Sequence, residues 1–221
     1  MFDYPQSSAT SLNGCRLATF APDRPLPLVI TPLSGHAGRL LEIASAGRIE
    51  LDVLLTRHGA ILFRGFDVDS PAVFDDFISR VSSEALFYSE RSSPRHAVYR
   101  NIYTSTDYPK DQRIFPHNEH SYSPVFPLKI FLWCDIAPLS RGETPIGDTR
   151  AITRAIDPEI RERFARLGIM YVRNYGDGFG LPWQTVFQTD DRAQVDAYCA
   201  SVGIQTEWKA DGRLRTRQVG P

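Results

Sequence analysis

His117 and Glu119 are the residues of this sequence whose types and spacing best suit metal chemistry. They stand two positions apart within residues 114–123, Ile-Phe-Pro-His-Asn-Glu-His-Ser-Tyr-Ser. In an extended strand, residues i and i+2 point to the same face. A neutral imidazole and a carboxylate on one face can bind a single divalent metal, and they make two-thirds of the facial triad of two histidines and one carboxylate that holds non-haem Fe(II). The spacing therefore predicts part of an iron site on a strand.

Two neighbours of this pair are expected to stay out of the site. His120 is three positions from His117, so a regular strand would point it to the opposite face. Asn118, between the two candidate ligands, should also face away from the metal. The spacing alone is a weak signal, because a surface strand with a local hydrogen bond between the histidine and the glutamate has the same sequence. Other features of the chain are needed to choose between a metal site and a surface strand.

The composition is that of an ordinary soluble protein and excludes several classes of partner. The 221 residues suit one large domain or two small ones, with 42% hydrophobic and 23% charged residues. A net charge of −1 and scattered arginines give no field that would attract nucleic acid or an anionic membrane. The start Met-Phe-Asp-Tyr-Pro-Gln lacks the features of a signal peptide, and no apolar run approaches a membrane span.

The number and spacing of the cysteines indicate the redox compartment of the protein. Cys15, Cys134 and Cys199 are odd in number, far apart and form no C-x-x-C pattern. This spacing argues against a disulfide framework or a zinc ribbon and fits a reducing compartment. We therefore expect a cytoplasmic protein that binds neither nucleic acid nor membranes.

The first part of the chain predicts helices next to a short sheet. Residues 1–25 are rich in Ser, Pro, Asn and Thr and lack a period, so they are expected to form a loosely attached arm. A helix should begin at Ser70-Pro71, because serine caps helices and proline suits the first turn. The other predicted elements are an edge strand at 25–30, two helices within 38–57 that are split at Gly47 and end at Gly59, and a buried strand at 60–66.

After this the chain becomes mostly β. The strongest strand signal is the run Leu-Lys-Ile-Phe-Leu-Trp-Cys-Asp-Ile at 128–136. Short strands separated by long loops are typical of a β-sandwich or jelly roll, so the predicted fold class is mainly β with flanking helices (α+β). The further predicted elements are strands at 98–104, 115–122 and 169–175, helices at 158–167 and 190–202, a hairpin of 204–208 with 214–219, a polar loop at 104–112, a turn at 142–145 and a glycine-rich loop at 176–182.

Four motifs in this order resemble one family. They are His-Gly-Ala-Ile-Leu-Phe-Arg-Gly-Phe at 58–66, Tyr-Thr-Ser-Thr-Asp-Tyr-Pro at 103–109, Pro-His-Asn-Glu-His-Ser-Tyr at 116–122 and Gly-Glu-Thr-Pro-Ile-Gly-Asp at 142–148. The chain resembles the Fe(II)- and 2-oxoglutarate-dependent dioxygenases of the taurine dioxygenase/clavaminate synthase-like superfamily. Within it, the chain looks most like the syringomycin-type hydroxylases of antibiotic and non-ribosomal peptide biosynthesis. The resemblance implies a double-stranded β-helix (jelly-roll) domain over residues 26–221, with helices packed outside it.

The resemblance gives three residues a role. His117 and Glu119 match the first histidine and the carboxylate of the family's metal triad. Thr144, in Gly-Glu-Thr-Pro, matches the threonine that helps bind the distal carboxylate of 2-oxoglutarate, and a hydroxyl can donate a charge-assisted hydrogen bond to such an anion. An ordinary turn residue before proline is the alternative for Thr144. Arg64 is expected to be structural, because it lies on a strand far upstream of the metal motif.

One departure from the family pattern concerns the C-terminal end. In the family, a second histidine comes late and is followed by an arginine that pairs with the 2-oxoglutarate carboxylate. This sequence ends at Gly220-Pro221, about where that histidine is expected. His36, His58 and His96 all precede the motif and match no such role. The jelly roll is therefore expected to be incomplete at the C-terminus, as in the N-terminal two-thirds of such an enzyme.

The resemblance implies an enzyme that hydroxylates an amino acid, either free or tethered to a carrier protein, with Fe(II) as cofactor and 2-oxoglutarate as co-substrate. Two alternatives stay open. A catalytically inactive β-sandwich binding module on the same scaffold is favoured by the lack of the late histidine. A cupin-like metal site for another reaction, such as an isomerisation, is disfavoured by the context of Thr144. The sequence determines neither the substrate nor the oligomeric state.

Overall fold

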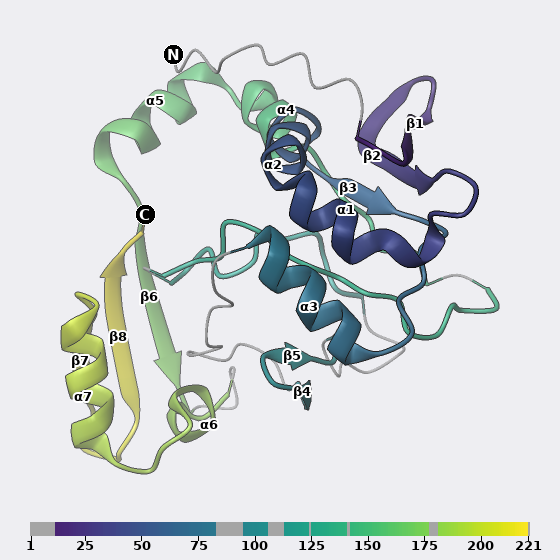
Figure 1. Ribbon diagram of the computed structural model, residues 1–221. Coiled ribbons are helices and arrows are strands. Elements are labelled where there is room, and N and C mark those ends of the chain that lie inside the picture. The colour runs from purple at the N-terminus through teal and green to yellow at the C-terminus, as the bar shows by residue number, and fades with distance from the viewer. Residues whose placement is uncertain are drawn as a thin grey trace. The chain divides into compact units, whose positions relative to one another are not determined.

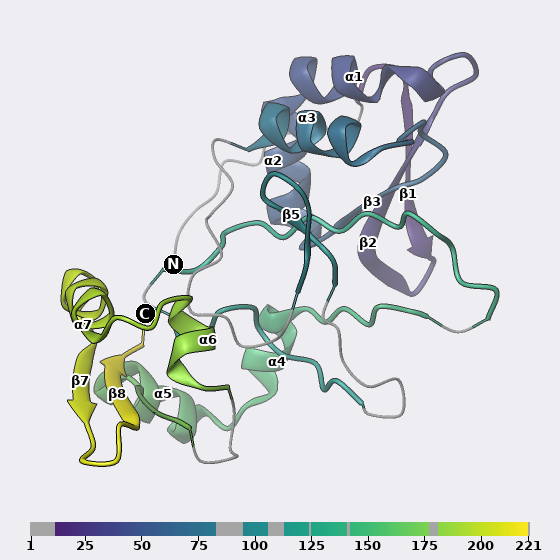
Figure 2. The same ribbon diagram turned by 90° about the horizontal axis from the view of Figure 1, so that it is seen from below.

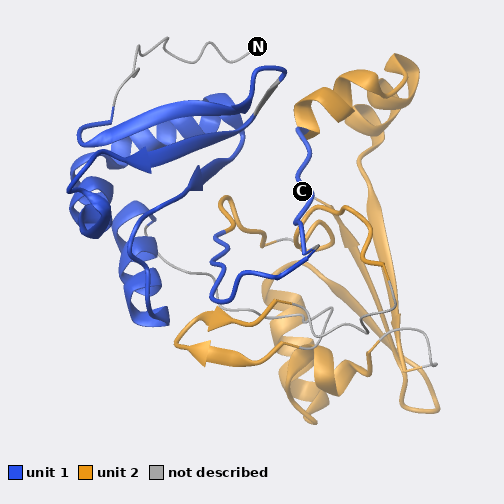
Figure 3. Ribbon diagram, turned by 90° about the vertical axis from the view of Figure 1, so that its right-hand side faces the viewer, with its two compact units in different colours: residues 1–85, 131–148 blue, residues 86–130, 149–221 orange. Residues whose placement is uncertain are grey.

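The computed structural model describes residues 12–82, 95–105, 113–123, 125–140, 142–176 and 181–220 (Figure 1). The chain divides into two compact units, which consist of residues 1–85 with 131–148 and of residues 86–130 with 149–221 (Figure 3). Each unit has a hydrophobic core of its own. No helix among the described residues is long and apolar enough to cross a membrane.

The first unit contains a three-stranded sheet of β1 (Cys15–Ala21), β2 (Arg24–Pro32) and β3 (Ile61–Phe63). Its order is β1-β2-β3, with β1 antiparallel and β3 parallel to β2. Two predictions were wrong here: residues 15–21 form a strand rather than part of an arm, and β2 lies in the centre rather than at the edge. Pro27 is tolerated in a central strand because it lies where the register with β1 shifts, between the pairs Thr19↔Leu28 and Ala21↔Arg24.

The helices of the first unit begin and end where their capping residues predict. The break at Gly47 is confirmed, and a Cβ at that position would meet Leu12 Cδ1 at 2.4 Å. Gly59 ends the second helix with a left-handed φ of 78°, and Ser70 Oγ accepts a hydrogen bond from the Val73 N–H at 3.4 Å. These helices lie on one side of the sheet (Figure 2). Their bounds are η1 Ala37–Arg39, α1 Leu40–Ala46, α2 Arg48–His58 and α3 Pro71–Val81.

The core of the first unit forms between the sheet and these helices. Ile30, at the centre of β2, is 0% exposed, and Leu54 of α2 and Phe77 of α3 are buried with it. Leu28, Leu40, Ile43 and Leu51 complete most of this cluster. Residues 131–148 return to the same unit, and Phe131 packs edge-on against Phe77 with ring centroids 6.3 Å apart.

The strand predicted at 128–136 is wrong, since residues 126–134 lack regular secondary structure apart from a bend at residue 128. Burial nevertheless alternates along this stretch: Phe131 and Trp133 are partly buried, while Leu132 is 70% exposed. A strand requires a neighbour that completes its hydrogen-bonded ladder, and no strand among the described residues pairs with this segment. The alternation of buried and exposed side chains agrees with the sequence pattern, but among the described residues no second strand pairs with this segment.

The second unit begins with a small hairpin of β4 (Ala97–Tyr99) and β5 (Ile102–Tyr103). The sequence predicted a single strand over 98–104, and the chain instead turns at Arg100, which has a φ of 46°. The hairpin is closed at its base by two hydrogen bonds: Thr104 N–H donates to the His96 carbonyl at 2.9 Å, and His96 N–H donates to Thr104 Oγ1 at 3.0 Å. Most of the polar loop predicted at 104–112 lies outside the described residues.

The remainder of the second unit is a three-stranded antiparallel sheet with helices, in the order β6-β8-β7. The predicted strand at 169–175, helices at 158–167 and 190–202 and hairpin of 204–208 with 214–219 are confirmed. The caps are the expected ones, since Asp157 and Asp191 each accept a backbone hydrogen bond at 2.8 Å. The elements are α4 Thr149–Ala155, α5 Pro158–Leu167, β6 Met170–Tyr175, α6 Trp183–Phe187, α7 Arg192–Ser201, β7 Gln205–Trp208 and β8 Leu214–Val219.

The two helices that the sequence missed, α4 and α6, are only seven and five residues long, too short to show a helical period. The core of this unit joins α6 and α7 to the sheet through Trp183, Val195, Cys199 and Leu214. Most of the predicted glycine-rich loop at 176–182 lies outside the described residues.

The closed jelly roll expected from the resemblance is not seen in the described part of the chain. Its strands form separate sheets of three, two and three members, and none of these closes into a barrel. The fold shown is thus a mixture of small sheets and helices in two units.

Candidate metal-binding site

His117 and Glu119 come together as predicted, but not on a strand. Residues 113–118 lack regular secondary structure and residues 119–122 form a turn, in which the Ser123 N–H donates to the His120 carbonyl at 3.0 Å. The prediction of a strand at 115–122 was therefore wrong. The two side chains nevertheless converge, with His117 Nε2 3.7 Å from Glu119 Oε2. This separation is beyond hydrogen-bond reach, so the alternative of a local bond between histidine and glutamate is not what holds the pair.

The imidazole of His117 is oriented by a backbone carbonyl. Its Nδ1 lies 2.8 Å from the Phe115 carbonyl oxygen. A carbonyl oxygen can only accept, so Nδ1 is the donor, and in the neutral imidazole Nε2 is then the nitrogen with the lone pair. Metal-binding histidines commonly use this arrangement, in which one ring nitrogen donates to the protein and the other faces the metal. The side chain is 57% exposed.

Among the described residues, Arg95 donates a hydrogen bond to one oxygen of the Glu119 carboxylate. Its Oε1 accepts a hydrogen bond from Arg95 Nη2 at 3.1 Å, and both side chains are mostly buried, at 21% and 24% exposure. A hydrogen bond between two charged groups is stronger than one between neutral groups. The other oxygen, Oε2, is the one that faces His117. One oxygen is thus occupied by the protein and the other is left for a ligand.

The end of this turn is attached to β6. The guanidinium of Arg173 lies 4.2 Å from the ring centroid of Tyr122 and 5.1 Å from that of Tyr175. Such cation–π contacts favour a fixed position for both partners. The ring of His120 stacks on Tyr122 with centroids 5.6 Å apart, and Ser123 is 1% exposed.

A third protein ligand is not found next to this pair. Within residues 12–220, apart from the stretches that the structure leaves undescribed, no group of three His, Cys, Asp or Glu side chains could hold a metal. His120 lies in the turn, where its ring stacks on Tyr122, and its exclusion from the site stays a prediction. An imidazole and a carboxylate are the donor types that a facial triad uses.

The structure also describes three other residues that the sequence analysis singled out. Thr144 belongs to the first unit, where residues 142–148 lack regular structure and its side chain is exposed, so its role toward 2-oxoglutarate stays a prediction. Asn118 is exposed. Arg64 is also exposed, and its backbone N–H donates to the Ile30 carbonyl at 3.0 Å, in agreement with a structural position beside β2.

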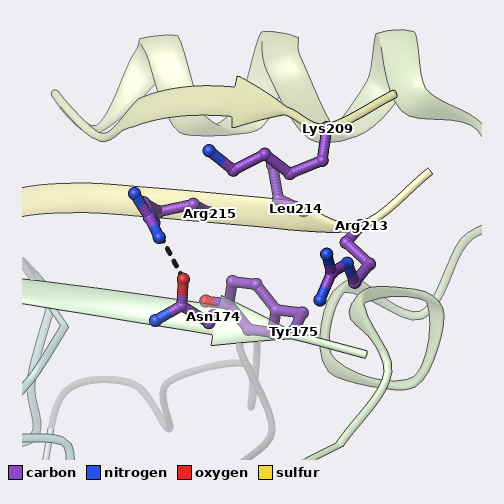
Figure 4. A pocket seen from close by; sticks show the side chains of 6 residues that line it. All are labelled: Asn174, Tyr175, Lys209, Arg213, Leu214 and Arg215. Atoms are coloured by element: carbon purple, nitrogen blue, oxygen red, sulfur yellow. Dashed lines mark hydrogen bonds between the residues drawn. The ribbon is translucent and has the colours of Figure 1, made fainter. Parts of the chain in front are cut away.

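A shallow polar hollow on the β6-β8-β7 sheet is a second place where a ligand could be sought (Figure 4). Each of its cations has a partner in the protein: Lys209 pairs with Glu207, Arg213 Nε lies 2.7 Å from Asp211 Oδ2, and Arg215 donates to the Asn174 side chain at 2.8 Å and lies 3.9 Å from Glu207. The hydrogen bond from Lys209 holds the pKa of Glu207 below its usual value. These pairings indicate a structural charge network and not an anion site. The hollow is lined by Asn174, Tyr175, Lys209, Arg213, Leu214 and Arg215.

Sequence reasoning missed the two arginines that support the turn. Arg95 is 24 positions from Glu119, and Arg173 lies on a strand of another part of the chain. A contact over such a separation leaves no periodic or spacing signal. The alternation of Tyr171, Arg173 and Tyr175 on one face of a strand could have been noticed, but it does not identify a partner.

Comparison with known proteins gives the chain a family context. Residues 24–219 match the family described as taurine catabolism dioxygenase TauD, TfdA family. A dapdiamide synthesis protein, DdaC, of Enterobacter agglomerans is 40% identical over 169 residues, which are 76% of this chain and 51% of that protein. A clavaminate synthase-like protein of Arabidopsis thaliana is 31% identical over 214 residues, which are 90% of this chain and 64% of that protein. The chain thus spans between about half and two-thirds of the length of these relatives.

Proposed function

We propose that this chain, which belongs to the taurine catabolism dioxygenase TauD/TfdA family, carries the first two metal ligands of an Fe(II)- and 2-oxoglutarate-dependent oxygenase. The resemblance inferred from the four sequence motifs agrees with this family. The observation that supports the proposal most is the convergence of His117 Nε2 and Glu119 Oε2 at 3.7 Å, with His117 Nδ1 turned to the Phe115 carbonyl oxygen at 2.8 Å.

In this proposal three residues bind the metal or the co-substrate. His117 Nε2 and Glu119 Oε2 would hold the metal, and the Thr144 hydroxyl would donate a hydrogen bond to the distal carboxylate of 2-oxoglutarate. Bound Fe(II) would supply the chemistry of the family, in which 2-oxoglutarate and O₂ are consumed together: one oxygen atom enters succinate as CO₂ is lost, and the other is inserted into an unactivated C–H bond as the new hydroxyl. The protein contributes binding, orientation and the exclusion of water. A third ligand has to come from outside the described pair.

The substrate is proposed from the relatives. The name of the Enterobacter agglomerans protein places it in the synthesis of dapdiamide, which supports a biosynthetic role for this chain. We propose an amino acid, free or tethered to a carrier protein, as the molecule that is hydroxylated in antibiotic or non-ribosomal peptide synthesis. The closer likeness to syringomycin-type hydroxylases belongs to the same proposal.

Metal binding by the purified chain tests the proposal directly. Co(II) can replace Fe(II) in air and is followed by titration against a chromogenic chelator. We expect weak binding that His117→Ala and Glu119→Ala abolish, while His120→Ala, a matched histidine in the same turn, keeps it. Two ligands hold a divalent ion less firmly than three, so we also expect this chain to form little succinate from 2-oxoglutarate. Binding that is unchanged in both His117→Ala and Glu119→Ala would contradict the proposal.

A second candidate is a binding module without catalysis. The observation in its favour is that the described residues hold no group of three metal ligands. Such a module would bind an aminoacyl carrier protein equally well with and without a chelator, whereas an oxygenase fragment would show the dependence on His117 described above.

A further inference from the structure

We propose that Arg95 is a positioning residue that makes Glu119 a one-oxygen ligand. This inference deepens the proposed function and rests on it. Arg95 Nη2 donates to Glu119 Oε1 at 3.1 Å, while Glu119 Oε2 faces His117 Nε2 at 3.7 Å. The arginine thus fixes which oxygen of the carboxylate is offered to a metal.

The position of Arg95 itself is well defined. It directly precedes His96, whose backbone N–H and carbonyl both pair with Thr104 at the base of the β4–β5 hairpin. Its side chain is 24% exposed and that of Glu119 21%, so the ion pair is screened less by solvent and salt than a surface pair. The hydrogen bonds between the backbone of His96 and Thr104 fix the chain next to Arg95, and the mostly buried ion pair with Arg95 restricts the rotation of the Glu119 carboxylate.

The consequence concerns how many positions Glu119 takes on a metal. A carboxylate binds metal ions through one oxygen or through two. In the facial triad each protein ligand takes one position, and the remaining positions stay open for other ligands. With one lone pair of Oε1 engaged by a guanidinium, Oε2 is the better metal donor, so Arg95 favours binding of Glu119 through one oxygen over binding through both.

The guanidinium of Arg95 lies next to a proposed cation site, and it has two opposing effects on metal binding. A guanidinium lowers the negative potential at the carboxylate and so opposes metal binding by charge alone. Fixing the orientation of a ligand acts in the other direction, because a freely rotating carboxylate has to be ordered when the metal binds. We expect the ordering effect to dominate, since the pair is mostly buried and the carboxylate loses the hydrogen bond from Arg95 when this residue is replaced.

The test compares Arg95→Met and Arg95→Lys with wild type by Co(II) titration and by the visible absorption spectrum of bound Co(II), which depends on the number of ligands. Arg95→Met should weaken binding about tenfold, as expected for a lost charge-assisted hydrogen bond, and change the spectrum. Arg95→Lys, which retains a charged donor, should recover a good part of the affinity. Arg100→Met is the matched control, because Arg100 belongs to the same hairpin and stacks on Tyr99 at 5.3 Å.

The possible results separate this inference from the proposed function. Binding that depends on His117 but is unchanged in affinity and spectrum by Arg95→Met, or is tightened by it, overturns the role of Arg95 alone. Binding that does not depend on His117 overturns the proposed function and this inference with it. A thermal melt of each variant shows whether a loss of binding reflects unfolding, and a weakened Arg95→Met variant that melts like wild type supports the positioning role.

Discussion

Replacing Arg173 by methionine is expected to loosen the turn that carries Glu119, one of the two candidate metal ligands. Arg173 stands on β6, and its guanidinium lies 4.2 Å from the Tyr122 ring and 5.1 Å from the Tyr175 ring. Tyr122 follows Glu119 by three residues, so this contact fixes the end of the turn against the sheet. Methionine keeps an apolar chain of similar reach and removes the charge.

The magnitude follows from the contact geometry. A cation–π contact contributes about 0.5–1 kcal/mol at exposed sites and about 2 kcal/mol when desolvated. Arg173 is partly buried and faces two rings, so about 1–2 kcal/mol is the relevant range. If all of this free energy is coupled to the position of the ligands, Co(II) affinity falls by about fivefold to thirtyfold, because ~1.4 kcal/mol corresponds to a factor of ten. This is an upper bound, since part of the loss appears as lower stability of the fold.

The assay is the same Co(II) titration, combined with thermal melting. Arg163→Met, at an exposed position of α5 in the same unit, controls for the loss of a positive charge. Affinity of Arg173→Met within twofold of wild type, or an equal loss in Arg163→Met, would refute the idea that Arg173 anchors the turn.

Three further predictions concern stability. Asp196→Ala should lower the free energy of unfolding of the second unit by about 1–3 kcal/mol in denaturant, because Asp196 accepts hydrogen bonds from Trp208 Nε1 at 3.0 Å and from Thr206 Oγ1 at 2.7 Å. Ile30→Ala, in the fully buried centre of β2, should cost about 2–5 kcal/mol and Ile30→Val about 0.5–1.5 kcal/mol in the same measurement. The folded pKa of Glu207 is lowered, chiefly by its hydrogen bond from Lys209, so its carboxylate stabilises the fold above its unfolded pKa and this contribution is lost as pH falls through the folded pKa. Glu207→Gln should therefore melt slightly below wild type near neutral pH and converge with it in acid.

Helix ends were predictable because their signals are local. Ser70, Asp157 and Asp191 each accept a backbone N–H two or three residues ahead, and Gly59 supplies a left-handed residue directly after its helix. The information needed for such a cap lies within one turn of the chain. Sequence reasoning therefore located α2, α3, α5 and α7 within a few residues.

Strands were predicted less well because a strand is defined by its partner. The run at 128–136 has the composition and the alternation of a strand, and yet no described strand pairs with it. The opposite error occurred at β1, whose sequence Cys-Arg-Leu-Ala-Thr-Phe-Ala gives a weak signal but which pairs along nearly its whole length with β2. Long-range pairing decided both outcomes, and no window of sequence contains it.

The candidate metal site depends on local spacing and also on long-range contacts. The approach of His117 to Glu119 depends on residues two apart, so spacing could predict it even though the backbone is a turn and not a strand. The support of that pair depends on Arg95 and Arg173, and these come from β4 and β6 regions that fold back over long separations. A pair of ligands placed only by local geometry would have to be ordered by the metal itself, at a cost to affinity. Arg95 and Arg173 contact the turn in the structure without a metal, so under the proposal the order of the site depends on residues that sequence spacing could not reveal.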